Sequence, residues 1–234
     1  MNVRIAALAV LLLVPTAAWP QCQVIDDFTT GKYKVRLDTP NATTTNYADP
    51  KRAQTGTMLG GVRVTAFLVA GNPFGQPGEL NVAKSGPQLV ISEGTRQFFR
   101  LDMQYGQDTN FNNVPLGYSP TGCDRFRVTF DSNSRVLNFN TLVFSPGTTY
   151  YQLGINMDAS PSPAPFCVDF PFDNFIKGGT STKGLQNFAG DGIDFLDFIF
   201  QSGSAIGAND FAVTKIETVS PATAIASPCT FVAP

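Results

Sequence analysis

The stretch that decides the fold is FFRLDMQY, residues 98–105. Its apolar side chains alternate with polar ones, Phe99, Leu101, Met103 and Tyr105 against Arg100, Asp102 and Gln104. Successive side chains of a β-strand point to opposite faces of the sheet, so this alternation predicts a strand with one face in the core and one in water. Residues 33–37 and 125–130 repeat the pattern. Together they favour an antiparallel sheet that is solvated on one side.

Three other runs are apolar on both faces and suit the central strands of a sandwich: residues 64–69, 137–144 and 193–200. Clusters of Gly, Pro, Asn and Ser separate the runs, and no helix-period segment of comparable strength occurs. The chain contains 20 Phe, 21 Gly and 17 Pro, which is typical of a β-protein with many turns. We therefore predict an all-β fold, a two-sheet antiparallel β-sandwich of the jelly-roll kind with about a dozen strands.

The two ends of the chain indicate an exported protein of one domain. Residues 5–14 form a short apolar run, and Thr16 and Ala18 are small residues at the positions that a signal peptidase requires. Residues 1–18 are thus predicted to be a signal peptide and residues 19–234 a single β-sandwich domain with short polar ends. The protein is expected to be secreted, with no insertion into a membrane, because the apolar run is too short to span a bilayer.

Four cysteines remain after the predicted cleavage site: Cys22, Cys123, Cys167 and Cys229. An even number in an oxidising compartment indicates two disulfides, for which three pairings exist. The termini of a compact domain often lie close together. We therefore expect Cys22 to pair with Cys229 and Cys123 to pair with Cys167.

Composition excludes several classes of function. The chain has no histidine, which excludes Ser-His-Asp and Cys-His catalysis and every His-ligated metal site. A net charge of −2 gives no field that would attract nucleic acid or an anionic membrane. Neither nucleic acid nor a membrane is therefore expected as a partner.

Four segments carry a resemblance to a known family: VIDDF at residues 24–28, MLGGVR at 58–63, DRFRVTF at 124–130 and ANDFAV at 208–213. Together they resemble exported bacterial jelly-roll domains of the carbohydrate-binding-module and galactose-binding-like type. The resemblance implies the sandwich fold and a non-catalytic protein that binds an extracellular polysaccharide or glycoconjugate.

The same resemblance implies that the first and last strands lie side by side near a structural calcium. Asp26, Asp27, Asn209 and Asp210 begin these strands, and their oxygens are ligands that Ca²⁺ accepts. Alternatively, they are turn residues whose side chains bind local amides. A second acidic cluster, residues 191–197, lacks the spacing of a calcium loop and is expected to be a solvated strand face.

Glycan binding requires aromatic faces for the sugar rings and amide or carboxylate partners for the hydroxyls. Aromatic residues in polar loops are the ones that can contact a sugar ring, whereas most aromatic residues of a Phe-rich sandwich are buried. The predicted glycan-binding residues are Tyr47, Tyr105, Asn110, Phe111, Asn112, Tyr118, Tyr150 and Tyr151.

Two other functions remain open. Low charge and polar ends would allow a self-associating subunit of an extracellular matrix or filament, in which copies of the chain pair at their edges. A carboxylate-based glycoside hydrolase or polysaccharide lyase would use Asp102 with Glu93, although outward charges that keep a sheet soluble explain both residues more simply. Asn41 begins an Asn-Ala-Thr sequon and is a predicted glycosylation site.

Overall fold

The computed structural model describes residues 22–38, 47–70, 74–84, 86–134, 137–144, 150–157, 165–178, 180, 192–202 and 210–234. The predicted signal peptide, the sequon at Asn41 and the candidate ligand Asn209 lie outside these residues. Tyr47 lies within a strand, but its side chain is outside the description. Among the described residues, no helix has the length and apolar character needed to cross a membrane.

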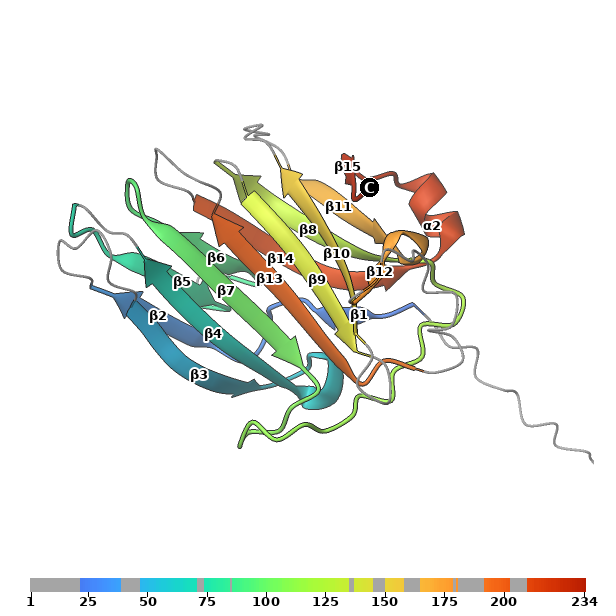
Figure 1. Cartoon of the computed structure of the whole chain (residues 1–234), viewed down its shortest axis with the longest axis horizontal. Helices are drawn as coiled ribbons and strands as arrows, with labels where there is room; N and C mark the ends of the chain where they lie inside the picture. Colours follow the sequence, from blue (N-terminus) through green and yellow to red (C-terminus); the bar gives the residue numbers. More distant parts are fainter. Residues whose placement is uncertain are drawn as a thin grey trace, which may run out of the picture.

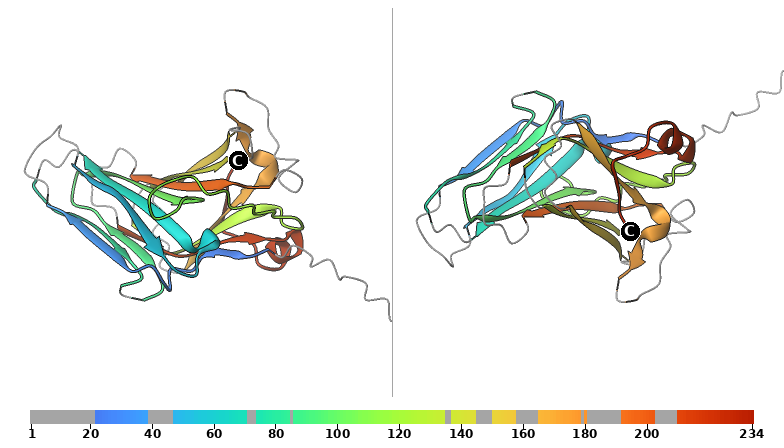
Figure 2. Two further views of the ribbon diagram at one scale, coloured as in Figure 1. Left: turned by 90° about the horizontal axis from the view of Figure 1, so that it is seen from below. Right: turned by 90° about the horizontal axis from the view of Figure 1, so that it is seen from above.

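Two β-sheets stack face to face (Figures 1 and 2). The eight-stranded sheet contains, in spatial order, β15 (Phe231–Val232), β11 (Phe166–Pro171), β8 (Arg125–Asn133), β14 (Asp210–Val219), β6 (Leu89–Ser92), β5 (Gly78–Val82) and β2 (Tyr33–Leu37), with β1 (Val24–Asp26) beside β14. The seven-stranded sheet contains β12 (Ile176–Lys177), β10 (Tyr150–Met157), β9 (Leu137–Phe144), β13 (Phe195–Ser202), β7 (Phe98–Tyr105), β4 (Val62–Ala70) and β3 (Tyr47–Thr55). The short helices are η1 (Leu59–Gly61), η2 (Phe172–Asn174) and α2 (Pro221–Ala226).

The predicted fold class, an all-β two-sheet sandwich, is confirmed. Strands from before and after residues 158–164 alternate within both sheets, so both halves of the chain build the same core. The first strand β1 lies beside β14, the last long strand, as the family resemblance implied. One detail differs, because β11 and β15 pair in parallel rather than antiparallel.

The alternating stretch forms β7, and its inward side chains Phe99, Leu101, Met103 and Tyr105 are fully buried. The runs that are apolar on both faces form β4, β9 and β13, which lie next to β7 or to one another in the middle of the seven-stranded sheet. Phe rings fill the space between the sheets: Phe139 stacks on Phe200 at 4.3 Å between ring centroids, and Phe130 on Phe166 at 5.0 Å. Such pairs contribute about 0.5–1.5 kcal/mol each beyond their burial.

Hydrogen bonds and an ion pair between polar side chains also join the two sheets. Arg63 on β4 is fully buried and donates to Asp26 on β1 at 2.5 Å and to the Gly31 carbonyl at 2.7 Å. At the edge, the Tyr33 hydroxyl on β2 donates to the Asp49 carboxylate on β3. Burial and this carboxylate raise the pKa of Tyr33. These two contacts are therefore structural, because each joins residues of opposite sheets.

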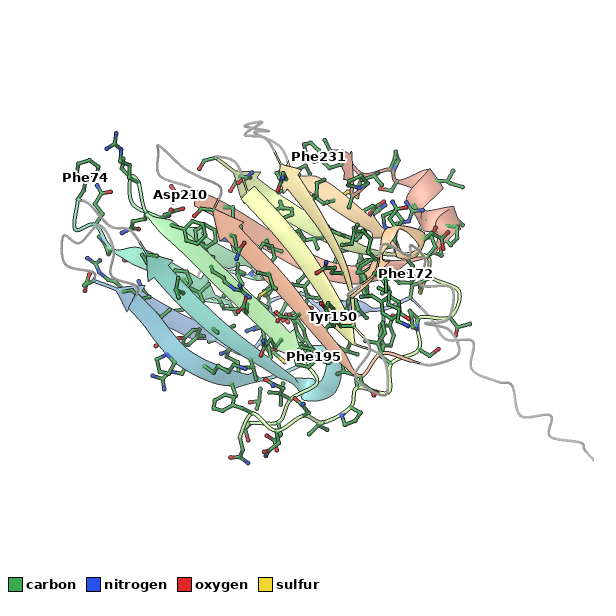
Figure 3. The ribbon with its side chains drawn as sticks, in the orientation of Figure 1. Phe74, Tyr150, Phe172, Phe195, Asp210 and Phe231 are labelled. Atoms are coloured by element: carbon green, nitrogen blue, oxygen red, sulfur yellow. A yellow bond between two sulfur atoms is a disulfide. The ribbon has the colours of Figure 1, made fainter. Side chains whose placement is uncertain are left out.

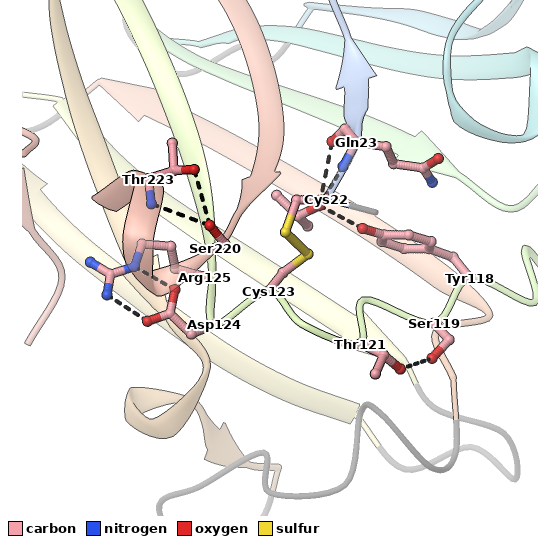
Figure 4. The surroundings of a disulfide bond; sticks show 11 residues. Cys22, Gln23, Tyr118, Ser119, Thr121, Cys123, Asp124, Arg125, Ser220 and Thr223 are labelled. Atoms are coloured by element: carbon pink, nitrogen blue, oxygen red, sulfur yellow. Dashed lines mark hydrogen bonds and ion pairs between the residues drawn. A yellow bond between two sulfur atoms is a disulfide. The ribbon is translucent and has the colours of Figure 1, made fainter. Parts of the chain in front are cut away.

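The four cysteines form two disulfides, as predicted, but the expected pairing is wrong. Cys22 pairs with Cys123 at a Cα separation of 5.6 Å, and Cys167 with Cys229 at 4.9 Å. Because β1 lies beside β14, Cys22 meets the segment that leads into β8 (Figure 4), and the parallel pairing of β11 with β15 brings the other two together. Closing loops of 101 and 62 residues stabilises the fold by about 4–5 kcal/mol each on the chain-entropy model. Two disulfides indicate an oxidising environment.

Candidate functional site

The candidate site is the outer face of the seven-stranded sheet, formed by the side chains that point away from the core. Strand register places Val64, Gln104 and Asp197 side by side on β4, β7 and β13. The next rows along these strands are Ala66, Asp102 and Ile199, then Leu68, Arg100 and Gln201. The centre of the face thus combines carboxyl, amide and guanidinium groups with aliphatic side chains.

Asp197 is the most unusual residue of this face. It is only 6% exposed, its Oδ2 accepts from Gln104 Nε2 at 3.0 Å, and its Oδ1 is buried with no hydrogen-bond partner among the described residues. Burial raises its pKa to about 7, and the nearby charge of Asp102 adds to the rise. The expectation of a solvated strand face at residues 191–197 is therefore corrected for Asp197, whose carboxyl group is buried beside Gln104.

Asp102 lies one row away, on the neighbouring strand. Its Oδ1 accepts from Arg100 Nε at 2.8 Å. Diagonal neighbours on adjacent strands are about 7 Å apart, so Asp102 and Asp197 form a carboxyl pair. The sequence-based pair of Asp102 with Glu93 is corrected, because Glu93 follows the end of β6 in the other sheet. The sequence shows that Asp102 and Asp197 are polar residues on the outward faces of two strands. That they lie close together could be predicted only if β7 and β13 were known to be neighbours.

Aromatic side chains lie at one end of the face. The backbone of Tyr150, at the start of β10, pairs with residue 144 of β9, which pairs with Phe195 at the start of β13, so the side chains of Tyr150 and Phe195 belong to the outer face. Tyr150 is 38% exposed, and Figure 3 shows Tyr150 and Phe195 at this end. Tyr151 points to the opposite side and packs against the core. Of the predicted glycan-binding residues, Tyr150 is the one that the structure places on this face with its side chain described.

Two of the predicted glycan-binding residues are buried, and their assignment is corrected. Tyr105 is fully buried and its hydroxyl donates to Asp26 Oδ2 at 2.9 Å. Tyr118 is 7% exposed, and its hydroxyl hydrogen-bonds Thr218 Oγ1 at 2.5 Å. Burial raises the pKa of both hydroxyls. Both rings belong to the core and are out of reach of a polysaccharide.

The loop that carries Asn110, Phe111 and Asn112 is exposed. Asp108 closes it, because its carboxylate accepts from the backbone N–H of Asn110 at 2.8 Å and of Asn112 at 2.9 Å. These hydrogen bonds, with one from the Asn112 side chain, lower the pKa of Asp108. A hydrogen bond from Leu116 N to the carbonyl of residue 194 ties the loop beside the start of β13. The loop therefore lies at the same end as Phe195, with Phe111 40% exposed.

The residues predicted to bind calcium do not gather in one place. Asp26 pairs with Ile216, whereas Asp210 pairs with Ser92. Residues 210 and 216 are about 20 Å apart along an extended strand. Asp26 is also saturated, accepting from Arg63, from Tyr105 and from the backbone N–H of residue 28.

Asp27 accepts from the backbone N–H and the hydroxyl of Thr29, and the hydroxyl bond lowers its pKa. Asp26 and Asp27 therefore make the local hydrogen bonds that the turn interpretation predicts, and calcium binding stays a prediction. Within the described residues, no group of three or more His, Cys, Asp or Glu could hold a metal ion.

No protein-family model matches the sequence, and no curated protein matches it either. Among solved structures, the chain is similar to a family 11 carbohydrate-binding module from a cellulosomal cellulase of Clostridium thermocellum, with 11% identity and a TM-score of 0.39 over 86% of this chain and 95% of that one. It is similar to the same kind of module from Clostridium thermocellum in complex with a β-1,3-1,4-mixed-linked tetrasaccharide, with 12% identity and a TM-score of 0.38 over 85% and 95%.

A third similar structure is an exo-β-agarase, with 12% identity and a TM-score of 0.39 over 85% of this chain and 25% of that one. At these identities and TM-scores, no residue role is carried over, and the function must be argued from the side chains of this chain.

Proposed function

We propose that the protein is a secreted, non-catalytic protein that binds a neutral polysaccharide through the outer face of the seven-stranded sheet. The observation that carries the proposal is Asp197, a buried carboxyl group at the centre of this face with Oδ1 unpartnered among the described residues. A buried polar atom without a hydrogen bond costs about 1–3 kcal/mol. A sugar hydroxyl that displaces a neighbouring side chain would supply the missing bond.

The rest of the face supplies what a polysaccharide needs. Gln104 and Gln201 offer donors and acceptors for hydroxyls, and Tyr150 with Phe195 offers apolar rings on which a sugar can pack. Five neighbouring strands from β4 to β10 span about 19 Å at the usual spacing, which accommodates several sugar rings.

The charges of the face favour a neutral ligand over an acidic one. Lys51 Nζ binds Gln104 at 3.0 Å and Arg100 binds Asp102 at 2.8 Å, so the cations are already engaged by groups of the face. Asp102 adds negative charge, and Asp197 adds more at pH values above its pKa of about 7. A polyuronate or sulfated glycan would meet carboxylates without an excess of cations to balance it.

The arrangement of the carboxyls supports binding rather than hydrolysis. Glycoside hydrolases place two carboxyls on either side of the bond that is cleaved. Asp102 and Asp197 project side by side from adjacent strands of one sheet. Both would therefore contact the same side of a bound glycan.

The alternative of a self-associating subunit finds no specific support at the edges described. The edge strand β3 carries Pro50 and an irregularity between Asp49 and Arg52. The edge strand β2 carries Lys34 and Arg36, both paired with Glu79. Proline, bulges and charges protect sheet edges against pairing with other copies. Self-association stays a prediction, and light scattering at high concentration tests it.

The experiment is titration of the secreted chain with soluble glucans, xylans, mannans and galactans, and with alginate as the acidic comparison, by affinity electrophoresis and calorimetry. We expect binding to at least one neutral polysaccharide and release of no reducing ends. Asp197→Asn is expected to weaken binding at least tenfold, about 1.4 kcal/mol. Lys215→Ala, on the outer face of the eight-stranded sheet, should leave the affinity within twofold. Binding to none of the polysaccharides, or equal binding by the two variants, would contradict the proposal.

A further inference from the structure

A pocket lies at the side of the sandwich where the last strands of the two sheets face each other. β2 ends the eight-stranded sheet and β3 ends the seven-stranded sheet, and Figure 1 shows both strands along the same side of the molecule. The pocket has a volume of about 380 Å³, and we call it the edge pocket. Its lining residues are Gly31, Lys32 and Tyr33 at the beginning of β2, and Arg52, Ala53, Gln54 and Thr55 at the end of β3. None of them belongs to the rows around Asp197.

The floor of the edge pocket is preformed. Gln54 is 6% exposed, its Nε2 donates to Thr65 Oγ1 at 3.0 Å, and its Oε1 accepts from Arg63 Nε at 3.0 Å. Gly31 has a φ of +67°, and its carbonyl accepts from Arg63 Nη2 at 2.7 Å. A Cβ at position 31 would lie 2.9 Å from that nitrogen, so both the backbone conformation and the space require glycine. The floor therefore does not have to rearrange to admit a ligand.

The walls of the edge pocket carry two cations and no carboxylate. Lys32 is exposed and has no ion-pair partner among the described residues. Arg52 is 54% exposed, and its Nε lies 3.5 Å from the Asp49 carboxylate. That carboxylate also accepts from the Tyr33 hydroxyl. Two cations against one carboxylate leave this pocket positive in a chain whose net charge is −2.

The edge pocket also has groups that suit a sugar. The ring of Tyr33 forms part of the wall, and the hydrogen bond from its hydroxyl to Asp49 holds the ring in place. Within the described sheets, β2 pairs with β5 and β3 with β4, so backbone N–H and C=O groups on the other side of each strand are outside any ladder. Such groups can bond with hydroxyls. The volume lies near the lower limit of about 300 Å³ for small-molecule pockets, which suits a single sugar residue.

We propose that the edge pocket binds one acidic sugar residue, a hexuronate, through Lys32 and Arg52. A planar guanidinium can hold both oxygens of a carboxylate, and the ammonium of Lys32 adds a second positive charge. The apolar side of the sugar ring packs on Tyr33, and the hydroxyls bond with the strand edges. This site does not rest on the proposed function, because the outer face of the seven-stranded sheet favours a neutral ligand and shares no lining residue with the edge pocket.

The test is titration of the secreted chain with glucuronate and galacturonate, followed by NMR and calorimetry. Glucose and galactose are the neutral counterparts, and sodium sulfate is the simple anion. We expect saturable binding of at least one hexuronate, about tenfold tighter than its neutral counterpart and weaker in high salt. Lys32→Gln and Arg52→Gln should each weaken hexuronate binding about fivefold or more. Lys34→Gln is the matched control, because Lys34 lies on the same strand but pairs with Glu79 at 3.3 Å, and its affinity should stay within about twofold of the wild type.

The three replaced side chains are exposed, so the variants should keep the urea midpoint of the wild type. Equal binding of a hexuronate and its neutral counterpart would overturn the proposal, as would undiminished hexuronate affinity in either Lys32→Gln or Arg52→Gln. Sulfate that binds as tightly as the hexuronate would overturn it too, because the pocket would then accept any anion.

The edge pocket and the outer face are tested separately by two of these variants. Affinity for a neutral polysaccharide should be unchanged in Lys32→Gln, and hexuronate affinity should be unchanged in Asp197→Asn. Any alginate binding should, by the same reasoning, be lost in Lys32→Gln and kept in Asp197→Asn. Failure of the edge pocket and failure of the glycan-binding face are therefore distinguishable outcomes.

Discussion

The outer faces of the two sheets differ in how their charges are satisfied. On the eight-stranded sheet, Arg127 donates two hydrogen bonds of 2.7 and 2.9 Å to the Asp169 carboxylate. Lys215 forms a salt bridge with Glu217 at 2.9 Å. On the seven-stranded sheet, the most buried carboxyl, Asp197, has one amide donor and an unpartnered oxygen among the described residues. Burial is similar at the two places, since Asp169 is 1% and Asp197 6% exposed.

This difference separates structural charges from charges that await a ligand. A buried carboxylate with a guanidinium partner is complete, and nothing outside the chain is needed to hold it. A buried carboxyl that lacks a cation keeps its proton up to neutral pH or takes a partner from solution. Under the proposed function, Asp197 belongs to the second kind and the Arg127–Asp169 pair to the first.

The largest effect is expected where the scaffold pairing is broken. Arg127→Met removes both bonds to Asp169 and leaves that buried carboxylate with a single bond from Arg125 at 3.1 Å. Removing one partner of a buried ion pair costs about 3–5 kcal/mol. The free energy of unfolding in urea should fall by this amount, whereas polysaccharide affinity at a temperature where the variant is folded should not change. A loss below about 1 kcal/mol would show that the pair is not structural.

The pH dependence of stability sharpens the comparison on the other face. Asp197 has a folded-state pKa of about 7, above the ordinary value of about 3.9 in the unfolded chain. The folded state then holds the extra proton between these values. The stabilising contribution of this group is therefore complete below pH about 4 and is lost as the pH rises to about 7, by up to roughly 4 kcal/mol.

Asp197→Asn does not titrate, so it should gain stability relative to the wild type over this pH range, as measured by urea unfolding from pH 4 to 8. Asp108→Asn is the control of opposite sign. Hydrogen bonds lower the pKa of Asp108, so its contribution is present at neutral pH and is lost only as the pH falls through the acid range. Parallel pH profiles for Asp197→Asn and the wild type would mean that Asp197 is solvated after all.

The strands could be predicted from the sequence because their signal is local. Alternation at residues 98–105 and the runs at 64–69 and 193–200 identify β7, β4 and β13 directly. The same alternation already placed Tyr105 inward, so its burial was predictable even though it was also considered as a glycan contact.

The candidate site was not predictable in the same way, because it depends on which strands become neighbours. Gln104 and Asp197 are 93 residues apart in the chain, and only the pairing of β7 with β13 brings them into contact. The predicted disulfide pairing was wrong for the same reason, since the positions of Cys22 and Cys229 depend on which strands lie beside β1 and β15. The burial of Asp197 on an outward-pointing position likewise arises from side chains of other strands.

A smaller effect is expected at the aromatic end of the binding face. Tyr150→Ala removes a partly exposed ring that a sugar would pack against, and truncating such a contact typically costs about 1–2 kcal/mol of binding. Affinity for the bound polysaccharide should fall about 5- to 30-fold by calorimetry, with little change in stability. Phe111→Ala in the nearby loop is the comparison. A larger loss of affinity in Phe111→Ala than in Tyr150→Ala would show that the sugar contacts lie on the loop rather than on the sheet.

The smallest effect is expected from Arg36, which repeats the chemistry of Arg127 on the same sheet but in water. Arg36 Nε lies 2.7 Å from Asp38 and its Nη1 3.0 Å from Glu79, yet its side chain is 52% exposed. Exposed ion pairs contribute about 0.2–1 kcal/mol, because water and salt screen the charges and two long side chains must be ordered. Arg36→Ala should therefore leave the urea midpoint of unfolding close to that of the wild type, and closer still in 0.5 M salt. Equal losses for Arg36→Ala and Arg127→Met would mean that the number of ion pairs, rather than their burial, determines the stability of this sheet, and the contrast between the two outer faces would lose its physical basis.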